Sequence, residues 1–335
     1  MLQYSNMKTL QELLKNIHIE ETKGALDVSV SVLSLSSKEV TTGTLFIALV
    51  GNVVDGHSFI PEAITNCASV IIHEKELSDY NPSVTYIRVA NTRDTLGKIA
   101  SAFYDNPSTK LKLIGITGTN GKTTTTTLLH QLFRNLGYNV GMIGTVVNKI
   151  NDESFESVRT TPDPITLNTL LADMVDARCE YCFMEVSSHA VSEERIAELS
   201  FAGGVFTNLT LDHLDYHETF ENYRDAKKHF FNMLPESAFA LSNKDDANGE
   251  YMLSDTKARK YFYALKAEAD LPAGQVGFNE RLDTKLIGEF NAYNILAIYS
   301  TAVILGEDKE KVKEIIKNLD PVRGRFEYVK SASGL

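Results

Sequence analysis

The residues with the clearest capacity for chemistry form a glycine-rich loop, residues 115–124, with the sequence Gly-Ile-Thr-Gly-Thr-Asn-Gly-Lys-Thr-Thr. An apolar run before the loop predicts a buried strand, and apolar residues at helical spacing after it predict a helix. Such a loop turns backbone N–H groups and the positive end of the helix dipole toward one point, where phosphate oxygens bind. Lys122 would reach the β- and γ-phosphates, and the hydroxyl of Thr123 would bind a magnesium ion.

The spacing of this loop differs from the common phosphate-loop pattern, which has four residues between its first glycine and Gly-Lys. Gly115 lies one residue too far back, and Ile116 fills the expected place. Gly118, Gly121 and Lys122 nevertheless stand in the right context, so we predict a phosphate site. The alternative is an ordinary glycine-rich turn.

Two further polar clusters follow predicted strands of the same region. Glu185 lies at the end of a strand predicted over residues 180–187, and an acid there, next to a phosphate loop, usually supports magnesium. A strand predicted over 203–208 is followed by three possible metal ligands, His213, Asp215 and His217. Their spacing matches no zinc template, and a phosphate site prefers hard cations. We therefore predict one histidine as a magnesium ligand with the others behind it, and a solvated polar loop is the alternative.

Two cationic groups could assist a reaction at this site. Lys227 lies in a helix predicted over residues 220–234, where a lysine is usually solvated. A desolvated lysine, however, loses its proton below its reference pKa of about 10.4 and becomes a nucleophile toward carbon dioxide or a substrate. Arg325 lies in Pro-Val-Arg-Gly-Arg-Phe-Glu. Its guanidinium could face charge on a transferring phosphoryl group, or it could belong to a surface turn.

Residues 243–246, Asn-Lys-Asp-Asp, fit the N-K-x-D pattern with which GTPases read guanine. A GTPase would also need an Asp-x-x-Gly switch after a strand, and Met-Glu-Val-Ser-Ser stands there instead, at residues 184–188. We therefore predict a strand-end turn followed by an N-capped helix. A guanine reader stays as the alternative.

Composition narrows the class of protein. Hydrophobic residues make up 43% and charged residues 23% of the 335 residues, as in soluble globular proteins. The net charge of -11 argues against a nucleic-acid partner, because such proteins concentrate positive charge. No apolar run reaches the length of a membrane span, and residues 1–15 have an amphipathic helical pattern without a signal-peptide core. We therefore expect a cytoplasmic protein, and we interpret Cys179 and Cys182 as partly buried strand residues rather than a redox or metal site.

The predicted elements alternate between strand and helix, which favours an α/β fold of two domains. A small domain over residues 1–108 contains short strands at 28–35, 45–50, 69–73 and 85–89 and helices at 60–66 and 92–104. A break at 105–108 separates it from a central domain, residues 109–330, with longer strands typical of a parallel sheet covered on both faces. Its last two helices are predicted at 294–305 and 309–319.

Two polar loops of the small domain, 35–38 and 51–57, follow predicted strands. A second nucleotide-like group could bind there, because α/β sheets bind ligands at the carboxyl ends of their strands. Ordinary turns have the same composition and are the alternative.

Five separated motifs together resemble the Mur ligases of peptidoglycan synthesis. They are Thr-Gly-Thr-Asn-Gly-Lys-Thr-Thr at 117–124, Glu-Val-Ser-Ser-His at 185–189, Asn-Leu-Thr-Leu-Asp-His-Leu-Asp-Tyr-His at 208–217, Gly-Glu-Phe-Asn at 288–291 and Gly-Arg-Phe-Glu at 324–327. The spacing of the glycine loop is the one that this family uses. Thr-Thr-Pro-Asp at 160–163, Leu-Phe-Ile-Ala-Leu at 45–49 and Asp-Gly-His at 55–57 are similar to one branch, the UDP-N-acetylmuramoyl-tripeptide synthetases, which add the third amino acid.

The resemblance implies roles for individual residues. ATP would be bound by Gly118, Thr119, Asn120, Gly121, Lys122, Thr123, Thr124 and Asn291. Two magnesium ions would be held by Thr123, Glu185, His213 and Lys227, the last as a carbamate. The muramoyl-peptide substrate would contact Ser37, Thr160, Thr161, Ser187, Glu193 and Arg195, with Ser37 at the uridine. The catalytic residues would be Lys122, Lys227, His213 and Arg325, with Arg325 approaching the γ-phosphate.

The resemblance also implies a fold and a reaction. The small domain would bind the UDP-sugar, and the central domain would be a P-loop ATPase domain with a mainly parallel sheet flanked by helices. A ligase of this branch uses ATP to join meso-diaminopimelate or L-lysine to UDP-MurNAc-L-Ala-D-Glu through an acyl phosphate. The alternatives are a sister ligase, which adds the terminal dipeptide or glutamylates folate, and a GTPase-like switch. We expect a monomer without nucleic-acid or membrane partners.

Three features depart from the family pattern. Asn52 and Val53 stand where some members have His-Gln, and Glu193 stands where a glutamine contacts the substrate. Family members continue after Gly-Arg-Phe-Glu into a third domain that binds the incoming amino acid, whereas this sequence stops at Leu335. We therefore expect the first two domains of a synthetase, which would bind its ligands without full turnover.

Overall fold

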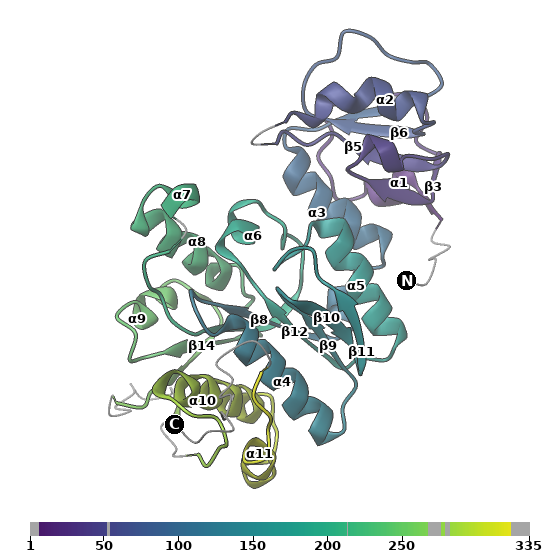
Figure 1. The fold of residues 1–335 in the computed structure, drawn as a ribbon. Coiled ribbons are helices and arrows are strands. Elements are labelled where there is room, and N and C mark those ends of the chain that lie inside the picture. The colour runs from purple at the N-terminus through teal and green to yellow at the C-terminus, as the bar shows by residue number, and fades with distance from the viewer. Residues whose placement is uncertain (1–6, 52–53, 213, 267–275, 279–281, 323–335) are drawn as a thin grey trace, which may run out of the picture. The chain divides into compact units, whose positions relative to one another are not determined.

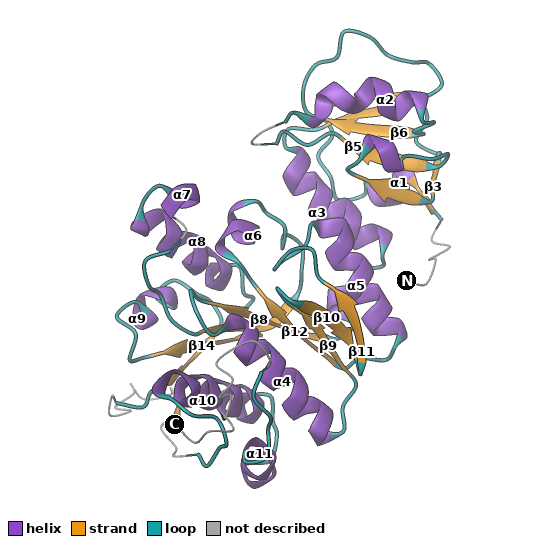
Figure 2. Cartoon of the chain, in the orientation of Figure 1, coloured by secondary structure: helices purple, strands orange, loops and turns teal. Residues whose placement is uncertain are grey.

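The computed structural model describes residues 7–51, 54–212, 214–266, 276–278 and 282–322, which form two compact units. The N-terminal unit contains the described residues up to Pro107 together with Pro162–Asp173 and Glu193–Leu199. The central unit contains Ser108–Thr161, Met174–Ser192 and the described residues from Ser200 onward. Figure 1 and Figure 2 show that each unit is a sheet with helices packed against it.

The N-terminal unit is built on a five-stranded sheet with the strand order β2-β7-β6-β5-β4. Four strands are parallel, namely β4 (Val32–Ser34), β5 (Thr44–Ile47), β6 (Val70–His73) and β7 (Thr85–Arg88), and β2 (Glu21–Lys23) is antiparallel. Successive residues of a strand point to opposite faces. Leu45 and Ile47 accordingly belong to one apolar core with α3 (Thr92–Phe103), and Phe46 belongs to another with α2 (Ile60–Thr65). Helices therefore cover both faces of this sheet.

The helix predicted over residues 1–15 is wrong within the described part of that range. Lys8–Thr9 form strand β1, which pairs with β3 (Ser29–Val30), and α1 (Leu10–Leu13) is a single turn. The helix starts at Leu10 because Thr9 and Glu12 form a capping box, in which each side chain accepts the other residue's backbone N–H. Leu10 and Leu13 are buried, so one turn of helix accounts for the apolar spacing.

The central unit has a nine-stranded sheet with the order β11-β10-β9-β12-β8-β13-β14-β15-β16. From β9 onward neighbouring strands are parallel: β9 (Val140–Ile143), β12 (Tyr181–Glu185), β8 (Lys112–Thr117), β13 (Phe201–Phe206), β14 (Phe239–Asn243), β15 (Arg259–Tyr263) and β16 (Val276–Phe278). The predicted α/β fold with a mainly parallel sheet is confirmed. At one edge, β10 (Val147–Ile150) and β11 (Glu153–Glu156) form an antiparallel hairpin that the sequence analysis missed.

Helices cover both faces of the central sheet at β8. Ile114 and Ile116 share an apolar core with α4 (Lys122–Leu136), α10 (Glu289–Ile304) and α11 (Lys309–Ile316). Gly115 points to the other face, where an added Cβ would lie 2.5 Å from the ring of Phe230 in α8 (Phe220–Asn232). Gly115 is therefore a packing residue of the strand, and the loop itself begins at Gly118. This explains the unusual glycine spacing.

The remaining helical segments are mostly short. They are α5 (Pro164–Asp176), α6 (Ser188–Ser192), α7 (Leu214–His217) and α9 (Gly249–Met252). The helix predicted from residue 294 begins earlier, because Gly288, with a φ of 103°, ends the preceding segment and Glu289 opens α10. Over the part of the chain that the structure describes, no helix combines the length and apolar character needed to cross a membrane.

Cys179 and Cys182 are both buried, more completely than predicted, and the predicted strand position is confirmed for Cys182 but wrong for Cys179, which precedes β12. Both are free thiols, and Cys182 lies within β12. Burial raises the pKa of Cys179 to about 11 and that of Cys182 well above its usual value. Both thiols are therefore protonated at neutral pH and unsuited to nucleophilic or redox chemistry.

Candidate active site

The glycine loop joins β8 to α4 and takes a backbone conformation that requires glycine at two positions. Gly118 has a φ of 150° and Gly121 a φ of 86°. An added Cβ would lie 2.0 Å from Thr207 Oγ1 at Gly118 and 2.6 Å from Asn294 Oδ1 at Gly121. No side chain caps the N-terminus of α4 at Gly121. A helix N-terminus of this kind suits a phosphate oxygen.

The end of β13 fixes the shape of the loop. Asn208 binds it three times: its carbonyl accepts the N–H of Thr119 at 2.8 Å, its Oδ1 accepts the N–H of Asn120 at 2.9 Å, and its Nδ2 donates to the carbonyl of Asn120 at 3.0 Å. The hydroxyl of Thr207 donates to the same carbonyl at 2.6 Å. The sequence analysis gave no role to Thr207 or Asn208, although their position directly after a strand beside β8 was the available signal.

Two lysines converge on the carbonyl of Gly118. Lys122 Nζ donates to it at 2.8 Å and to the carbonyl of Thr119 at 2.9 Å, and Lys227 Nζ donates to it at 3.0 Å. Lys227 is 1% exposed, with its amine 4.5 Å from the ring centre of Tyr223. Burial lowers the pKa of Lys227 well below its usual range, and the charge of Lys122 lowers it further. A buried amine of low pKa is the neutral nucleophile that the sequence analysis anticipated at this position.

Glu185 lies at the carboxyl end of β12 with its carboxylate almost completely buried. Oε1 accepts the N–H of Thr145 at 2.9 Å. Oε2 accepts the hydroxyls of Thr145 at 3.0 Å and of Thr123 at 3.1 Å. All three of these donors are neutral groups. Through Thr123, the carboxylate of Glu185 contacts the phosphate loop.

Three of the predicted substrate-binding residues lie close to Glu185. The hydroxyl of Thr161 donates to the carbonyl of Glu185 at 2.8 Å and accepts the N–H of Ser187 at 3.2 Å. The hydroxyl of Thr160 lies 3.1 Å from that of Thr145. Thr160, Thr161 and Ser187 therefore form one hydrogen-bonded network with Glu185 and Thr123.

A pocket of about 580 Å³ opens beside the phosphate loop. The loop contributes Asn120, Gly121 and Thr124, and the first turns of α10 contribute Glu289, Phe290, Asn291, Tyr293 and Asn294. Asn291 was predicted near the nucleotide, and this position is compatible with that role. Further lining residues come from β13 and β14 and the segments after them, including Thr207, Asn243, Asp245 and Asp246.

The other predicted substrate residues lie in the N-terminal unit. Arg195 pairs with Glu193, its Nε lying 2.8 Å from Glu193 Oε2. Ser37 follows β4, is buried, and donates its hydroxyl to Glu62 at 2.6 Å. His57, in the predicted Asp-Gly-His loop, binds Asp55 through Nδ1 at 2.7 Å, and its Nε2 accepts the N–H of Glu74 at 3.1 Å. His57 therefore ties the loop after β5 to the loop after β6.

The guanine-reading alternative for residues 243–246 finds no support, because the side chains of Asn243 and Asp246 bind the backbone. Asn243 donates to the carbonyl of Thr207 at 3.0 Å, and Asp246 accepts the N–H of Leu209 at 2.8 Å. The predicted strand-end turn is confirmed. The predicted N-capped helix is wrong in its cap, because Asn248 precedes α9 without a side-chain cap bond.

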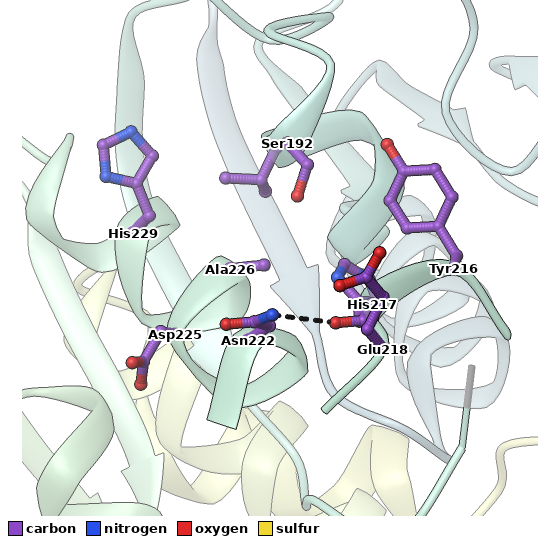
Figure 3. A pocket seen from close by; sticks show the side chains of 9 residues that line it. Ser192, Tyr216, His217, Glu218, Asn222, Asp225, Ala226 and His229 are labelled. Atoms are coloured by element: carbon purple, nitrogen blue, oxygen red, sulfur yellow. Dashed lines mark hydrogen bonds between the residues drawn. The ribbon is translucent and has the colours of Figure 1, made fainter. Parts of the chain in front are cut away.

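A second pocket, of about 490 Å³, lies among α6, α7 and α8 (Figure 3). Several of its polar groups bind one another or nearby residues: Asn222 donates to the carbonyl of His217 at 2.9 Å. His217 Nε2 lies 2.9 Å from the hydroxyl of Ser188. Asp225 accepts the hydroxyl of Tyr251 at 2.9 Å. His217, predicted to lie behind the metal ligand, thus holds α7 against α6.

The predicted magnesium site is only partly within the described residues. His213 and Arg325 lie outside them, as do Asn52 and Val53. The described residues contain no group of three or more His, Cys, Asp or Glu side chains suited to a metal. Glu185 and the hydroxyl of Thr123 nevertheless provide oxygen donors next to a phosphate loop, which is the donor chemistry that magnesium prefers over zinc. The residues present therefore fit magnesium.

A parallel sheet with a glycine loop leading into an uncapped helix, and an acid at the end of the neighbouring strand, defines a P-loop nucleotide-binding protein. This agrees with comparisons with known families. The chain matches the Mur ligase middle domain over residues 116–302 and the Mur ligase catalytic domain over residues 29–104. It belongs to the Mur ligase family.

Relatives with assigned names are similar over nearly the whole chain. The chain is 48% identical to "UDP-N-acetylmuramoyl-L-alanyl-D-glutamate--2,6-diaminopimelate ligase" of Cytophaga hutchinsonii and 46% identical to the ligase of the same name from Bacteroides fragilis. Each comparison covers 97% of this chain and 69% of the relative. A solved structure of a ligase of that name matches the fold with a TM-score of 0.81, at 24% identity, over 97% of this chain and 69% of that one. The predicted family and enzyme class, ligase, are thereby confirmed.

Proposed function

We propose that this protein is an ATP-dependent amide ligase that joins 2,6-diaminopimelate to UDP-MurNAc-L-Ala-D-Glu. The proposal is supported by the names of relatives that are 46% to 48% identical over 97% of the chain. Those names favour diaminopimelate over lysine as the acceptor, and they favour this step over a terminal-dipeptide ligase, a folate-glutamylating enzyme or a GTPase.

One structural observation carries the proposal to the level of residues. Hydrogen bonds join the phosphate loop, the buried carboxylate of Glu185 and the pair Thr160–Thr161 at the carboxyl ends of the neighbouring strands β8 and β12. A ligase of this kind needs a γ-phosphoryl group and a substrate carboxylate side by side. The network connects residues proposed for both groups.

In the proposed reaction the free carboxylate of the muramoyl dipeptide attacks the γ-phosphorus of ATP. A carboxyl O–P bond forms, the bond from the γ-phosphorus to the bridging oxygen breaks, and ADP leaves with that electron pair. The amine of diaminopimelate then attacks the acyl carbon, phosphate leaves, and the amine loses its proton. The protein contributes position and charge to both steps. Lys122 would meet the γ-phosphate in place of the loop carbonyls that it binds now, and Arg325 would face the same charge.

Magnesium, when bound, would neutralise phosphate charge and polarise the γ-phosphoryl oxygens. Thr123 and Glu185 would hold it, together with His213. Lys227 would serve as a carbamate: its neutral amine attacks the carbon of CO₂, an N–C bond forms, one C=O electron pair moves to oxygen, and a proton leaves to solvent. The product is an anion and would provide a ligand for a second ion.

The proposal assigns different substrates to the two parts of the chain. Residues 1–108 would form the UDP-sugar-binding domain, with Ser37 at the uridine, and residues 109–330 would form the ATP-binding domain. Glu193 and Arg195 would contact the dipeptide. ATP and the UDP-sugar are both cytoplasmic compounds, so the reaction is placed in the cytoplasm, and we propose a monomer.

Calorimetric titration with UDP-MurNAc-L-Ala-D-Glu, in the presence of magnesium and a non-hydrolysable ATP analogue, tests this function. We expect saturable binding that weakens about tenfold or more in Ser37→Ala and Arg195→Ala, because each change removes a polar contact to the substrate. A Ser31→Ala variant of the same unit is the matched control and should bind normally. Binding of a folate instead, or a preference for GTP over ATP, would contradict the proposal.

A further inference from the structure

We propose that Thr145 is a positioning residue that sets the carboxylate of Glu185 and the hydroxyl of Thr160 in one arrangement. Thr145 would thereby couple the magnesium-nucleotide side of the site to the acyl-substrate side. The inference rests on the proposed function, because it takes Glu185 as a magnesium ligand and Thr160 as a substrate contact.

Thr145 binds both oxygens of the Glu185 carboxylate. Its backbone N–H donates to Oε1 at 2.9 Å, and its hydroxyl donates to Oε2 at 3.0 Å. Gly144 allows this approach, since a Cβ there would lie 2.8 Å from Oε1. The two bonds fix the plane of the carboxylate against the segment that follows β9.

The bonds to Thr145 use only part of the capacity of the Glu185 carboxylate to accept hydrogen bonds or to bind a metal ion. An ionised carboxylate offers about four lone-pair positions. Thr145 occupies two of them, and the hydroxyl of Thr123 occupies a third at 3.1 Å. The remaining lone pair is on Oε1, and Oε2 is the oxygen that contacts the phosphate loop, through the hydroxyl of Thr123.

The edge hairpin of the central sheet holds Thr145 in place. Gly144 donates its N–H to Asn148 Oδ1 at 3.2 Å, and its carbonyl accepts the hydroxyl of Ser157 at 2.6 Å. Asn148 lies in β10, and Ser157 directly follows β11. The hairpin therefore anchors the turn that carries Thr145, which gives this antiparallel addition to the parallel sheet a function.

The link to Thr160 depends on one exposed hydroxyl. The hydroxyl of Thr145 donates to Thr160 Oγ1 at 3.1 Å and to Glu185 Oε2 at 3.0 Å, so its single proton is shared between these two acceptors. Thr161 reaches Glu185 independently, through the backbone carbonyl. Removing the Thr145 hydroxyl should disconnect Thr160 and leave Thr161 in place.

Thr145→Val and Thr145→Ser test the proposal. Valine keeps the shape of the side chain and the backbone N–H but removes the hydroxyl, whereas serine keeps the hydroxyl and the backbone N–H but removes the methyl group. The first readout is calorimetric binding of a non-hydrolysable ATP analogue over a range of magnesium concentrations. We expect Thr145→Val to raise the magnesium concentration needed for half-maximal binding about tenfold, as for residues that orient a metal ligand. Thr145→Ser should stay within about threefold of the original protein.

The second readout is the affinity for UDP-MurNAc-L-Ala-D-Glu in a cycle with Thr160→Val. If Thr145 acts through Thr160, the double variant should bind no more weakly than Thr160→Val alone. Three outcomes would each overturn the inference. In the first, the losses of affinity in the two single variants multiply in the double variant. In the second, Thr145→Val binds as well as the original protein, and in the third, Thr145→Ser binds as weakly as Thr145→Val. Failure of the unchanged protein to bind the muramoyl dipeptide would overturn the proposed function instead. Thermal unfolding of Thr145→Ser should match that of the original protein, because serine keeps the hydroxyl that donates to Glu185.

Discussion

The ends of β12 and β14 carry polar clusters in the same sheet, and they differ in what their side chains bind. At β12, both carboxylate oxygens of Glu185 accept threonine donors from two separate loops, two of the three donors being hydroxyls. At β14, Asn243 and Asp246 bind backbone groups: Asn243 donates to the carbonyl of Thr207, and Asp246 accepts the N–H groups of Leu209 and Asn248. The first cluster pairs a carboxylate with two hydroxyls and one backbone N–H, and the second pairs Asn243 and Asp246 with main-chain groups.

This difference separates a reactive strand end from a structural one. A backbone N–H or C=O that is buried without a partner costs free energy, so a side chain that pairs with it belongs to the fold. Threonine hydroxyls can rotate toward a ligand without leaving a backbone group unpaired. The sequence predicted a strand-end turn for the Asn-Lys-Asp-Asp motif and a magnesium-supporting acid in the Glu-Val-Ser-Ser motif, and the hydrogen-bond partners of the two motifs agree with this distinction.

The largest expected difference between the two motifs is the effect of replacing their lysines on the reaction rate. Lys122→Ala should reduce the rate of acyl-phosphate formation by about a hundred- to a thousandfold, because it removes one preorganised cation from the developing phosphoryl charge. Lys244→Ala, at the corresponding place in Asn-Lys-Asp-Asp, should change the rate less than about threefold. Phosphate release in the ligase reaction of an intact synthetase that carries each substitution measures both. A near-normal rate in Lys122→Ala, or an equal loss in Lys244→Ala, would contradict the assignment of the phosphate loop.

A second pair of variants separates stability from metal binding. Asn243→Ala should lower the free energy of unfolding by about 1 to 3 kcal/mol, because the buried carbonyl of Thr207 loses a donor. Glu185→Gln should change it by less than about 1 kcal/mol, because an amide of the same shape can keep bonds to Thr145 and Thr123. Urea unfolding without ligands measures both.

The same Glu185→Gln variant should lose the magnesium dependence of nucleotide binding, and Asn243→Ala should retain it. Glu185→Gln could instead be less stable than Asn243→Ala, with nucleotide binding that still depends on magnesium. Glu185 would then have a structural role, and there would be no basis for a metal ligand at the end of β12.

The strands with a strong apolar pattern were predictable because burial on both faces leaves little room for polar residues. Those around β8 and β12 were therefore predicted to within about two residues. The hairpin β10–β11 was missed because Asn148 and Ser157 act through hydrogen bonds, which leave no periodicity in the sequence. The helix predicted over residues 1–15 failed because a capping box and a short strand pairing override helical spacing.

In the candidate site too, residues that belong to a sequence pattern were predicted, and residues that act through hydrogen bonds to distant parts of the chain were missed. Residues of the phosphate loop, with Glu185 and Lys227, stand next to strands or carry a recognisable motif, so the sequence could point to them. Thr145 could not be found in this way, because it acts on a residue 40 positions away. Tyr223, whose hydroxyl lies 3.0 Å from that of Thr119, was missed for the same reason. Such contacts are set by sheet order, which single-sequence patterns do not determine.

The smallest effect should come from Lys227, which is buried like Asn243 and yet opposes stability. Burial lowers the pKa of its amine. Between that lowered value and the unfolded value of about 10.4, the unfolded chain holds a proton that the folded protein lacks. The free energy of unfolding therefore rises with pH across this window and falls as pH decreases. Lys227→Met removes this contribution while keeping an unbranched side chain of similar length.

In buffer depleted of carbon dioxide at pH 7, Lys227→Met should be as stable as the original protein or more stable by about 1 kcal/mol, although it should lose ligase activity. The gain should shrink as the pH approaches 10, because the original protein no longer has a proton to release on folding. Urea unfolding at pH 7, 8.5 and 10 measures the slope. A loss of stability like that expected for Asn243→Ala would mean that the bond of Lys227 to the carbonyl of Gly118 outweighs its desolvation. Lys227 would then belong with the residues that hold the fold, as Asn243 does at β14.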